Sequence, residues 1–217
     1  MSAIFPPAAN LAAKLTLLGL AGLVIAGVGW WLLWPRTDYA RHRDWIAEQP
    51  VPFSHQHHVG GLGIDCRFCH QTVEVAGDAG LPPTYTCMTC HSQIWTSAAV
   101  LAPVRQSLAD NRPLAWHRVT DLPDYVYFNH GIHIAKGVGC SECHGDITQM
   151  PLTQKARTMT MEFCVACHRD PGPRLRPADQ IYNTSWKRGS ETPPPDALIR
   201  QYHVEGRTLT DCSICHR

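Results

Sequence analysis

The sequence predicts a mostly irregular chain with short α-helices, preceded by one N-terminal transmembrane helix. Three observations predict this class. All ten cysteines fall in five copies of Cys-x-x-Cys-His, an uncharged run of twenty residues lies near the N-terminus, and the 217 residues include seventeen prolines and sixteen glycines. Proline and glycine favour turns and extended chain over long helices or sheets. The formal net charge of +1 gives nucleic-acid binding no electrostatic support.

The repeated Cys-x-x-Cys-His pattern is the attachment signature of c-type haem. Two thiols separated by two residues can form thioethers to both vinyl groups of one porphyrin, and the adjoining imidazole is then the proximal iron ligand. A zinc knuckle or a thioredoxin-type redox pair would explain a single Cys-x-x-Cys. Five copies, each followed by histidine and leaving no stray cysteine, favour five covalently attached haem c groups. The expected attachment and proximal residues are Cys66, Cys69 and His70; Cys87, Cys90 and His91; Cys140, Cys143 and His144; Cys164, Cys167 and His168; Cys212, Cys215 and His216.

Residues 51–217 are expected to form the pentahaem domain. These 167 residues provide about 33 residues for each of five haems. So little chain around so much porphyrin implies that the haems themselves form the core, with the polypeptide wrapped around them. Covalent tethers then take the stabilising role that disulfides or structural metals have in small domains. The predicted fold class is therefore a multihaem cytochrome c.

Residues 1–50 are expected to form a membrane anchor and a linker. The uncharged run Leu15–Trp34 would span roughly 30 Å as an α-helix, which is the hydrocarbon thickness of a bilayer. Trp30, Trp31 and Trp34 occupy the place of an interfacial aromatic belt, and Pro35 ends the segment. A cleaved signal peptide would have a small-x-small site after the apolar run, and Trp-Pro-Arg-Thr-Asp offers none.

The charges that flank this helix conflict with the expected orientation. Lys14 precedes the apolar run, whereas Arg36, Arg41 and Arg43 follow it, so the positive-inside rule favours a cytoplasmic haem domain. Covalent haem c is normally made on the outer face of an energy-transducing membrane. Because long domains can translocate despite local charge, we expect a single-pass protein of the cell membrane with its haem domain on the periplasmic side.

An internal repeat predicts the distal iron ligands. The order Phe-x-His-x-x-His, haem motif, haem motif occurs twice, at residues 53–91 and 128–168, which indicates duplication of one unit. Two histidines at positions i and i+3 of one helical turn can direct their rings to neighbouring haems. His57 has Ile132 as its counterpart and is expected to be a bystander. The expected distal ligands are His55, His58, His130 and His133.

The fifth haem needs another sixth ligand. Met161 is our choice, because it lies three residues before Cys164, where the first half has Thr84 before Cys87. A thioether is a soft ligand that raises the haem potential relative to bis-imidazole ligation. The other candidates for this haem are Met150, Met159 and His203. His42 and His117 are less favoured as ligands of any of the haems.

With these residues in view, the chain resembles the membrane-anchored pentahaem cytochrome c subunit of alternative complex III, a bacterial quinol-oxidising complex. The resemblance covers nearly the whole chain. Besides the N-terminal helix, it rests on Phe53-Ser54-His55, Gly63-Ile64-Asp65-Cys66-Arg67, Pro82-Pro83-Thr84, Leu122-Pro123-Asp124-Tyr125-Val126-Tyr127-Phe128-Asn129-His130, Gly137-Val138-Gly139-Cys140 and the segment from Cys164 to Arg169.

The resemblance implies an electron relay. Quinol would be oxidised in polytopic membrane subunits, and electrons would pass through an iron–sulfur subunit to this haem chain. From there they would reach a soluble cytochrome c or cupredoxin, or a terminal oxidase. Such a relay needs no catalytic site of its own. Two alternatives are a membrane-anchored multihaem quinol dehydrogenase that feeds a periplasmic reductase, and a multihaem reductase with an open coordination position at one iron.

Overall fold

The computed structural model describes residues 6–204 and 208–216. The chain divides into two compact units, one that ends at Arg43 and one that begins at Asp44. The predicted boundary between residues 50 and 51, which assigned the linker to the anchor, stays a prediction.

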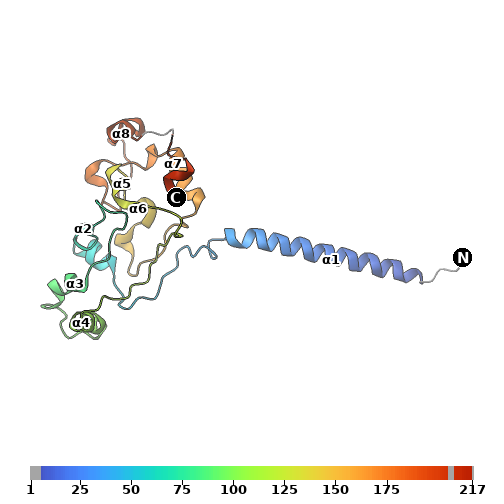
Figure 1. Cartoon of the computed structure of the whole chain (residues 1–217), viewed down its shortest axis with the longest axis horizontal. Coiled ribbons are helices and arrows are strands. Elements are labelled where there is room, and N and C mark those ends of the chain that lie inside the picture. The colour runs from blue at the N-terminus through green and yellow to red at the C-terminus, as the bar shows by residue number, and fades with distance from the viewer. Residues whose placement is uncertain (1–5, 205–207, 217) are drawn as a thin grey trace. The chain divides into compact units, whose positions relative to one another are not determined.

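The first unit is a long apolar helix, α1 (Pro7–Leu33), followed by a short 3-10 turn, Trp34–Arg36 (Figure 1). Pro7 is suited to the first helical position because its missing N–H would have no intrahelical partner there. The segment Ala8–Arg36 has a mean hydropathy of 2.1 over its best window and is long enough to cross a membrane. The prediction of one N-terminal apolar helix that is a candidate membrane span is therefore confirmed.

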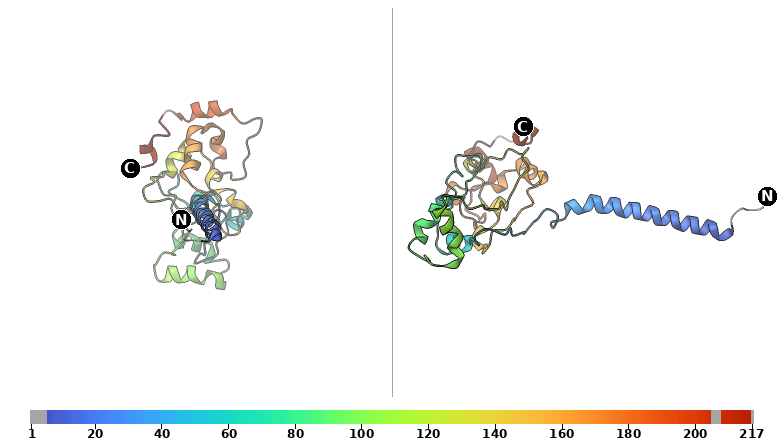
Figure 2. Two further views of the ribbon diagram at one scale, coloured as in Figure 1. Left: turned by 90° about the vertical axis from the view of Figure 1, so that its right-hand side faces the viewer. Right: turned by 60° about the horizontal axis from the view of Figure 1, so that its bottom comes forward.

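The second unit consists of short helices joined by irregular chain (Figures 1 and 2). Its described residues form no strand, only three isolated antiparallel bridges: Ile46 with Gln154, Val126 with His216 and Val138 with Leu175. This confirms the predicted fold class. The α-helices are α2 (Cys66–Cys69), α3 (Thr84–His91), α4 (Ala102–Ala109), α5 (His130–Ala135), α6 (Ser141–His144), α7 (Met161–Arg169), α8 (Pro195–Gln201) and α9 (Cys212–Cys215); a π-helical turn spans Gln56–Gly61, and 3-10 turns span Ala99–Leu101, Ile147–Gln149, Gly172–Arg174 and Ala178–Gln180.

Each Cys-x-x-Cys-His motif lies on or at the edge of one of these helices, namely α2, α3, α6, α7 or α9. Local capping starts two of them. The Asp65 side chain accepts a hydrogen bond from the Arg67 amide at 2.8 Å, and the Thr160 hydroxyl accepts one from the Phe163 amide at 3.4 Å. One helical turn brings positions i and i+3 to the same face. Both cysteines of a motif can therefore reach one ligand.

Ordinary hydrophobic packing is sparse in the second unit. Among the described residues, one buried apolar cluster consists of Val51, Leu101 and Val104, where α3 and α4 pack together. The buried hydrophobic residues among those described are Ala47, Val51, Val73, Leu101, Val104, Met150, Leu175, Ile181 and Leu198. The expectation that the polypeptide supplies little of its own core agrees with this set.

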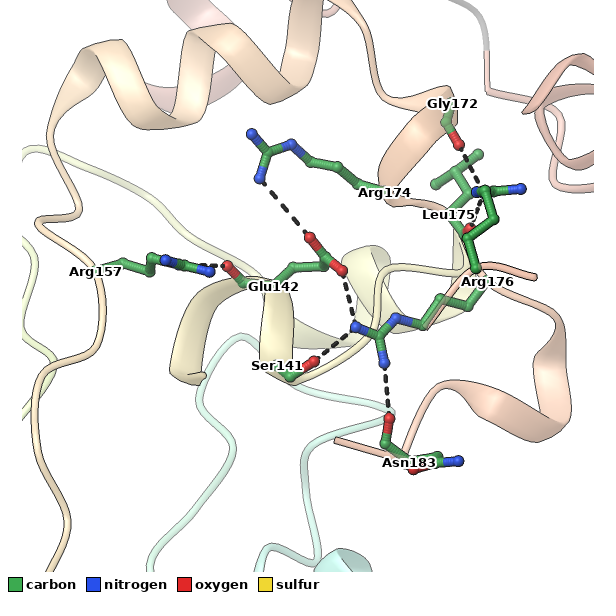
Figure 3. Close-up of polar contacts among 9 residues, drawn as sticks. Ser141, Glu142, Arg157, Gly172, Arg174, Leu175, Arg176 and Asn183 are labelled. Atoms are coloured by element: carbon green, nitrogen blue, oxygen red, sulfur yellow. Dashed lines mark hydrogen bonds and ion pairs between the residues drawn. The ribbon is translucent and has the colours of Figure 1, made fainter. Parts of the chain in front are cut away.

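A buried arginine links the third motif to the segment that follows α7. The Arg176 side chain is 2% exposed and donates hydrogen bonds to the Asn183 carbonyl at 2.7 Å, the Ser141 hydroxyl at 2.6 Å and the Glu142 carboxylate at 2.8 Å (Figure 3). Ser141 and Glu142 are the two variable residues of the third motif. A Cβ at Gly139 would collide with the guanidinium, so glycine is required immediately before Cys140.

Replacing this arginine should destabilise the unit because it leaves Glu142 without its closest charged partner. We expect Arg176→Gln to lower the free energy of unfolding of the haem-loaded protein by about 3 kcal/mol, measured by urea titration. Arg174→Gln is the matched control. Arg174 approaches the same carboxylate at 3.8 Å with a third of its side chain exposed, so its loss should cost below about 1 kcal/mol. Equal effects of the two changes would contradict the assignment.

Candidate haem sites

The proximal imidazoles are oriented by backbone carbonyls. In four of the five motifs the proximal Nδ1 lies within hydrogen-bond distance of a carbonyl oxygen. Because a carbonyl can only accept, Nδ1 carries the proton, and the Nε2 lone pair is available to a metal. The pairs are His70 with Gly80 at 2.7 Å, His91 with Ile94 at 3.3 Å, His168 with Leu209 at 2.7 Å and His216 with Tyr125 at 3.1 Å.

The predicted distal histidines are held in the same manner. Nδ1 of three of these rings donates to a carbonyl: His58 to Ser54 at 2.9 Å, His130 to Gly77 at 2.8 Å and His133 to Asn129 at 2.7 Å. Nδ1 of His55 lies 2.9 Å from the Thr153 hydroxyl. All four predicted distal rings thus have Nδ1 engaged, and Nε2 is the atom that would bind a metal.

In three pairs, a predicted distal ring and a predicted proximal ring lie at the separation that a shared iron would require. Metal–imidazole bonds are about 2 Å long, so two rings that share one metal have their centroids about 6 Å apart. The ring centroids are 6.2 Å apart for His58 and His91, 6.4 Å for His130 and His144, and 6.1 Å for His133 and His168. The donor set therefore fits haem with two axial imidazoles.

The fourth distal histidine, His55, lies beside the proximal ligands of the first and third motifs. Burial, followed by the charges of His70, His58 and His144, lowers the pKa of His55 to about 4. Burial, followed by His130 and His70, likewise lowers the pKa of His144 to about 4. Both rings are therefore neutral at physiological pH, which is the protonation state that binds a metal.

One phenylalanine in each half contacts both distal rings. Phe53 stacks on His58, with centroids 4.4 Å and planes 23° apart, and meets His55 edge-on at 4.9 Å and 85°. Phe128 stacks on His133 at 4.4 Å and 27°, and meets His130 edge-on at 4.7 Å and 88°. Each phenylalanine therefore fixes two imidazole planes at once, in the same geometry in both halves.

The thiols of different motifs lie close enough to influence one another. Burial and the neighbouring Cys87 raise the pKa of Cys69. Burial and Cys66 raise that of Cys140 to about 11. Burial, Cys167 and Cys164 raise that of Cys143 to about 12, and burial with Cys215 raises that of Cys164. The thiols of the first and second, first and third, third and fourth, and fourth and fifth motifs therefore influence one another.

The fifth motif is attached to the segment that precedes Phe128. Val126 and His216 form an antiparallel bridge, the Tyr127 amide donates to the Cys215 carbonyl at 2.8 Å, and the Tyr125 ring lies 5.8 Å from His216. Met161, the expected sixth ligand here, is the first residue of α7 and is 67% exposed. Its role stays a prediction.

The remaining histidines and methionines are placed as follows. His57 stacks with Trp95 at 6.3 Å, and the His117 amide donates to the Gln49 side chain at 3.0 Å. Met150 is buried. Met159 and His203 adopt a left-handed backbone, and His42, which does the same, belongs to the first unit.

Sequence reasoning missed the residues that orient the imidazoles. The Gly77, Gly80 and Leu209 carbonyls act through the backbone, and any residue type offers a carbonyl, so no side-chain pattern marks them. Thr153 lies 98 positions from His55 and belongs to no motif. Only the glycine at position 80, whose φ of +75° requires an unusual backbone, gave a local signal.

Loss of a stacking ring should change the angle between axial imidazoles without removing a ligand. The g-values of low-spin ferric haem depend on that angle, so we expect Phe128→Leu to shift or broaden the electron paramagnetic resonance signal of the His133–His168 site. Phe128→Tyr keeps the ring and serves as the control. The lost aromatic contact is worth about 0.5–1.5 kcal/mol, so the haems should stay bound. Identical g-values in Phe128→Leu and the parent protein would contradict this role.

Two comparisons with known proteins bear on the class of this chain. Residues 126–217 match the family of cytochrome c7 and related cytochrome c. Over 151 residues the chain is 34% identical to the menaquinone reductase multiheme cytochrome c subunit of Nitratidesulfovibrio vulgaris. That match covers 69% of this chain and 62% of the relative, so the chain spans less than two thirds of the relative's length. In fold class the chain is a multihaem cytochrome c, and its cofactor is covalently bound haem c.

Proposed function

We propose that this chain is the electron-transfer subunit of a membrane quinol:electron-acceptor oxidoreductase of the alternative complex III type. It would carry five haems on the periplasmic side and pass electrons from an iron–sulfur subunit to a periplasmic carrier or a terminal oxidase. Haem c supplies one-electron redox chemistry at its iron when bound. The observation that carries this proposal is that the attachment motifs form one continuous series.

The series starts with the second motif, which adjoins the first. The Cys87 thiol lies near enough to Cys69 to raise its pKa. The distal histidines that we assign to these two motifs, His55 and His58, lie one helical turn apart and share Phe53. A common turn fixes the spacing of the two sites, so neither can move without the other.

The first motif adjoins the third. Nδ1 of His130, the distal ligand opposite His144, donates to Gly77 in the loop after the first motif, and the Gly131 amide donates to Ala76 at 3.1 Å. The Cys66 thiol lies near enough to Cys140 to raise its pKa. The two halves of the repeat are therefore joined through a distal ligand.

The third, fourth and fifth motifs continue the series. His130 and His133 lie on one turn of α5, and Cys143 neighbours Cys164. The His168 imidazole then donates to the carbonyl of Leu209, just before the fifth motif, and Cys164 neighbours Cys215. The order in space is thus second, first, third, fourth and fifth, with the second and fifth motifs at the ends.

The ligand set supports a relay over a reductase. At three sites an imidazole lies opposite the proximal ring, where it would fill the remaining axial position of a bound haem and leave none for a substrate. Carbonyls that accept from Nδ1 of His58, His130 and His133 would hold these rings in place when the oxidation state changes. The multihaem reductase alternative receives no support from these three sites.

A second candidate function is that of a menaquinone reductase subunit, which differs from the first in the direction of electron flow. The similar protein from Nitratidesulfovibrio vulgaris is named as a subunit of a menaquinone reductase, so in that protein the quinone is the acceptor. By this likeness the present chain would carry electrons towards the membrane quinone pool. A quinol dehydrogenase that feeds a periplasmic reductase would use the opposite direction and different partners.

Purification of the native complex in mild detergent tests the proposal. We expect mass spectrometry to find iron–sulfur and polytopic membrane subunits with this chain, added quinol to reduce its haems, and electron cryomicroscopy to place the irons in the order second, first, third, fourth and fifth. Reduction by a soluble donor but not by quinol would favour the menaquinone reductase candidate. Recovery with a periplasmic reductase alone, or irons in the order of the chain, would contradict the proposal.

A further inference from the structure

A pocket lies where α1 ends, within the first unit. It is lined by the apolar residues Trp31, Leu32 and Pro35 and by the cations Arg36 and Arg41. At the same level Trp30 stacks on Trp34, with centroids 4.9 Å apart, and Trp34 contacts Tyr39 at 5.7 Å. Aromatic side chains gather in this way at the headgroup level of a bilayer. The pocket thus combines an apolar wall with two positive charges, and it would lie at the depth of lipid headgroups if α1 spans the bilayer.

Backbone carbonyls orient both arginines, but no carboxylate among the described residues neutralises their charge. Arg36 donates to the Leu32 carbonyl, and Nε of Arg41 donates to the Pro35 carbonyl at 3.1 Å. Each guanidinium has five N–H donors, so these contacts at the helix end leave most of them available. Among residues 6–204 and 208–216, neither arginine forms an ion pair with a carboxylate, whereas Arg43 pairs with Asp38 at 3.2 Å.

We propose that this pocket binds the phosphate group of an anionic phospholipid between Arg36 and Arg41. Arginine matches phosphate geometry through paired N–H donors, and the Trp31 and Leu32 side chains offer a surface to the acyl chains. The proposal rests on the proposed membrane anchor. Under the proposed orientation, these arginines lie on the outer side, where the positive-inside rule disfavours them. A bound anionic headgroup compensates for that placement.

Native mass spectrometry of the haem-loaded full-length chain in detergent tests the site, with phosphatidylglycerol and phosphatidylcholine as probes. We expect the parent protein to retain phosphatidylglycerol in preference to phosphatidylcholine. Arg36→Gln with Arg41→Gln should weaken phosphatidylglycerol binding by about fivefold for each arginine removed and leave phosphatidylcholine unchanged. Glutamine keeps an amide donor for the helix-end carbonyls, so α1 should still fold, which circular dichroism can verify.

Arg43→Gln is the matched control, because that arginine is already paired, and it should bind phosphatidylglycerol as the parent does. Equal loss in Arg43→Gln, unchanged binding in the double variant or no lipid preference in the parent would overturn the site. Displacement of the lipid by excess inorganic phosphate would show that the pocket binds free phosphate, and it would overturn the assignment of a phospholipid. Carbonate extraction of native membranes tests the anchor separately, since release of the chain would refute the anchor itself.

Discussion

The structure depends on imidazole rings held at one nitrogen and free at the other. A metal-binding histidine needs its second nitrogen fixed, or the ring rotates and the ligand atom is lost. In this chain the fixing partner is usually a backbone carbonyl: Gly80 for His70, Leu209 for His168, Asn129 for His133. The irregular segments thus supply the carbonyls that orient these rings, in a unit whose described part contains no strand.

These supports also connect the sites to one another. Gly77, in the loop after the first motif, accepts a hydrogen bond from His130, the predicted distal ligand that faces the third motif. Leu209, just before the fifth motif, accepts one from His168, the predicted proximal ligand of the fourth. A segment that positions one site therefore belongs to the next. The few buried apolar residues and the buried Arg176–Glu142 pair add local rigidity, but the continuity of the series comes from this sharing of supports.

The sequence was sufficient for the elements that depend on residue type. The five Cys-x-x-Cys-His motifs predict the attachment sites, and the repeated Phe-x-His-x-x-His predicts distal rings such as His58 and His133, whose centroids lie 6.2 and 6.1 Å from those of His91 and His168. The sequence could not supply the spatial order of the motifs. The contact that places the third motif beside the first is made by the backbone carbonyl of Gly77, and no residue pattern marks that loop. The sequence also gives no sign of Thr153 or Arg176, whose partners lie far along the chain.

Covalently bound haems at all five motifs would take the place of a conventional protein interior. Intact mass of the purified chain, combined with pyridine haemochrome analysis, tests this claim most directly. The account predicts the mass of the polypeptide plus five haems, with every cysteine consumed in thioether bonds. Markedly fewer than five haems per chain in a correctly folded protein would contradict it.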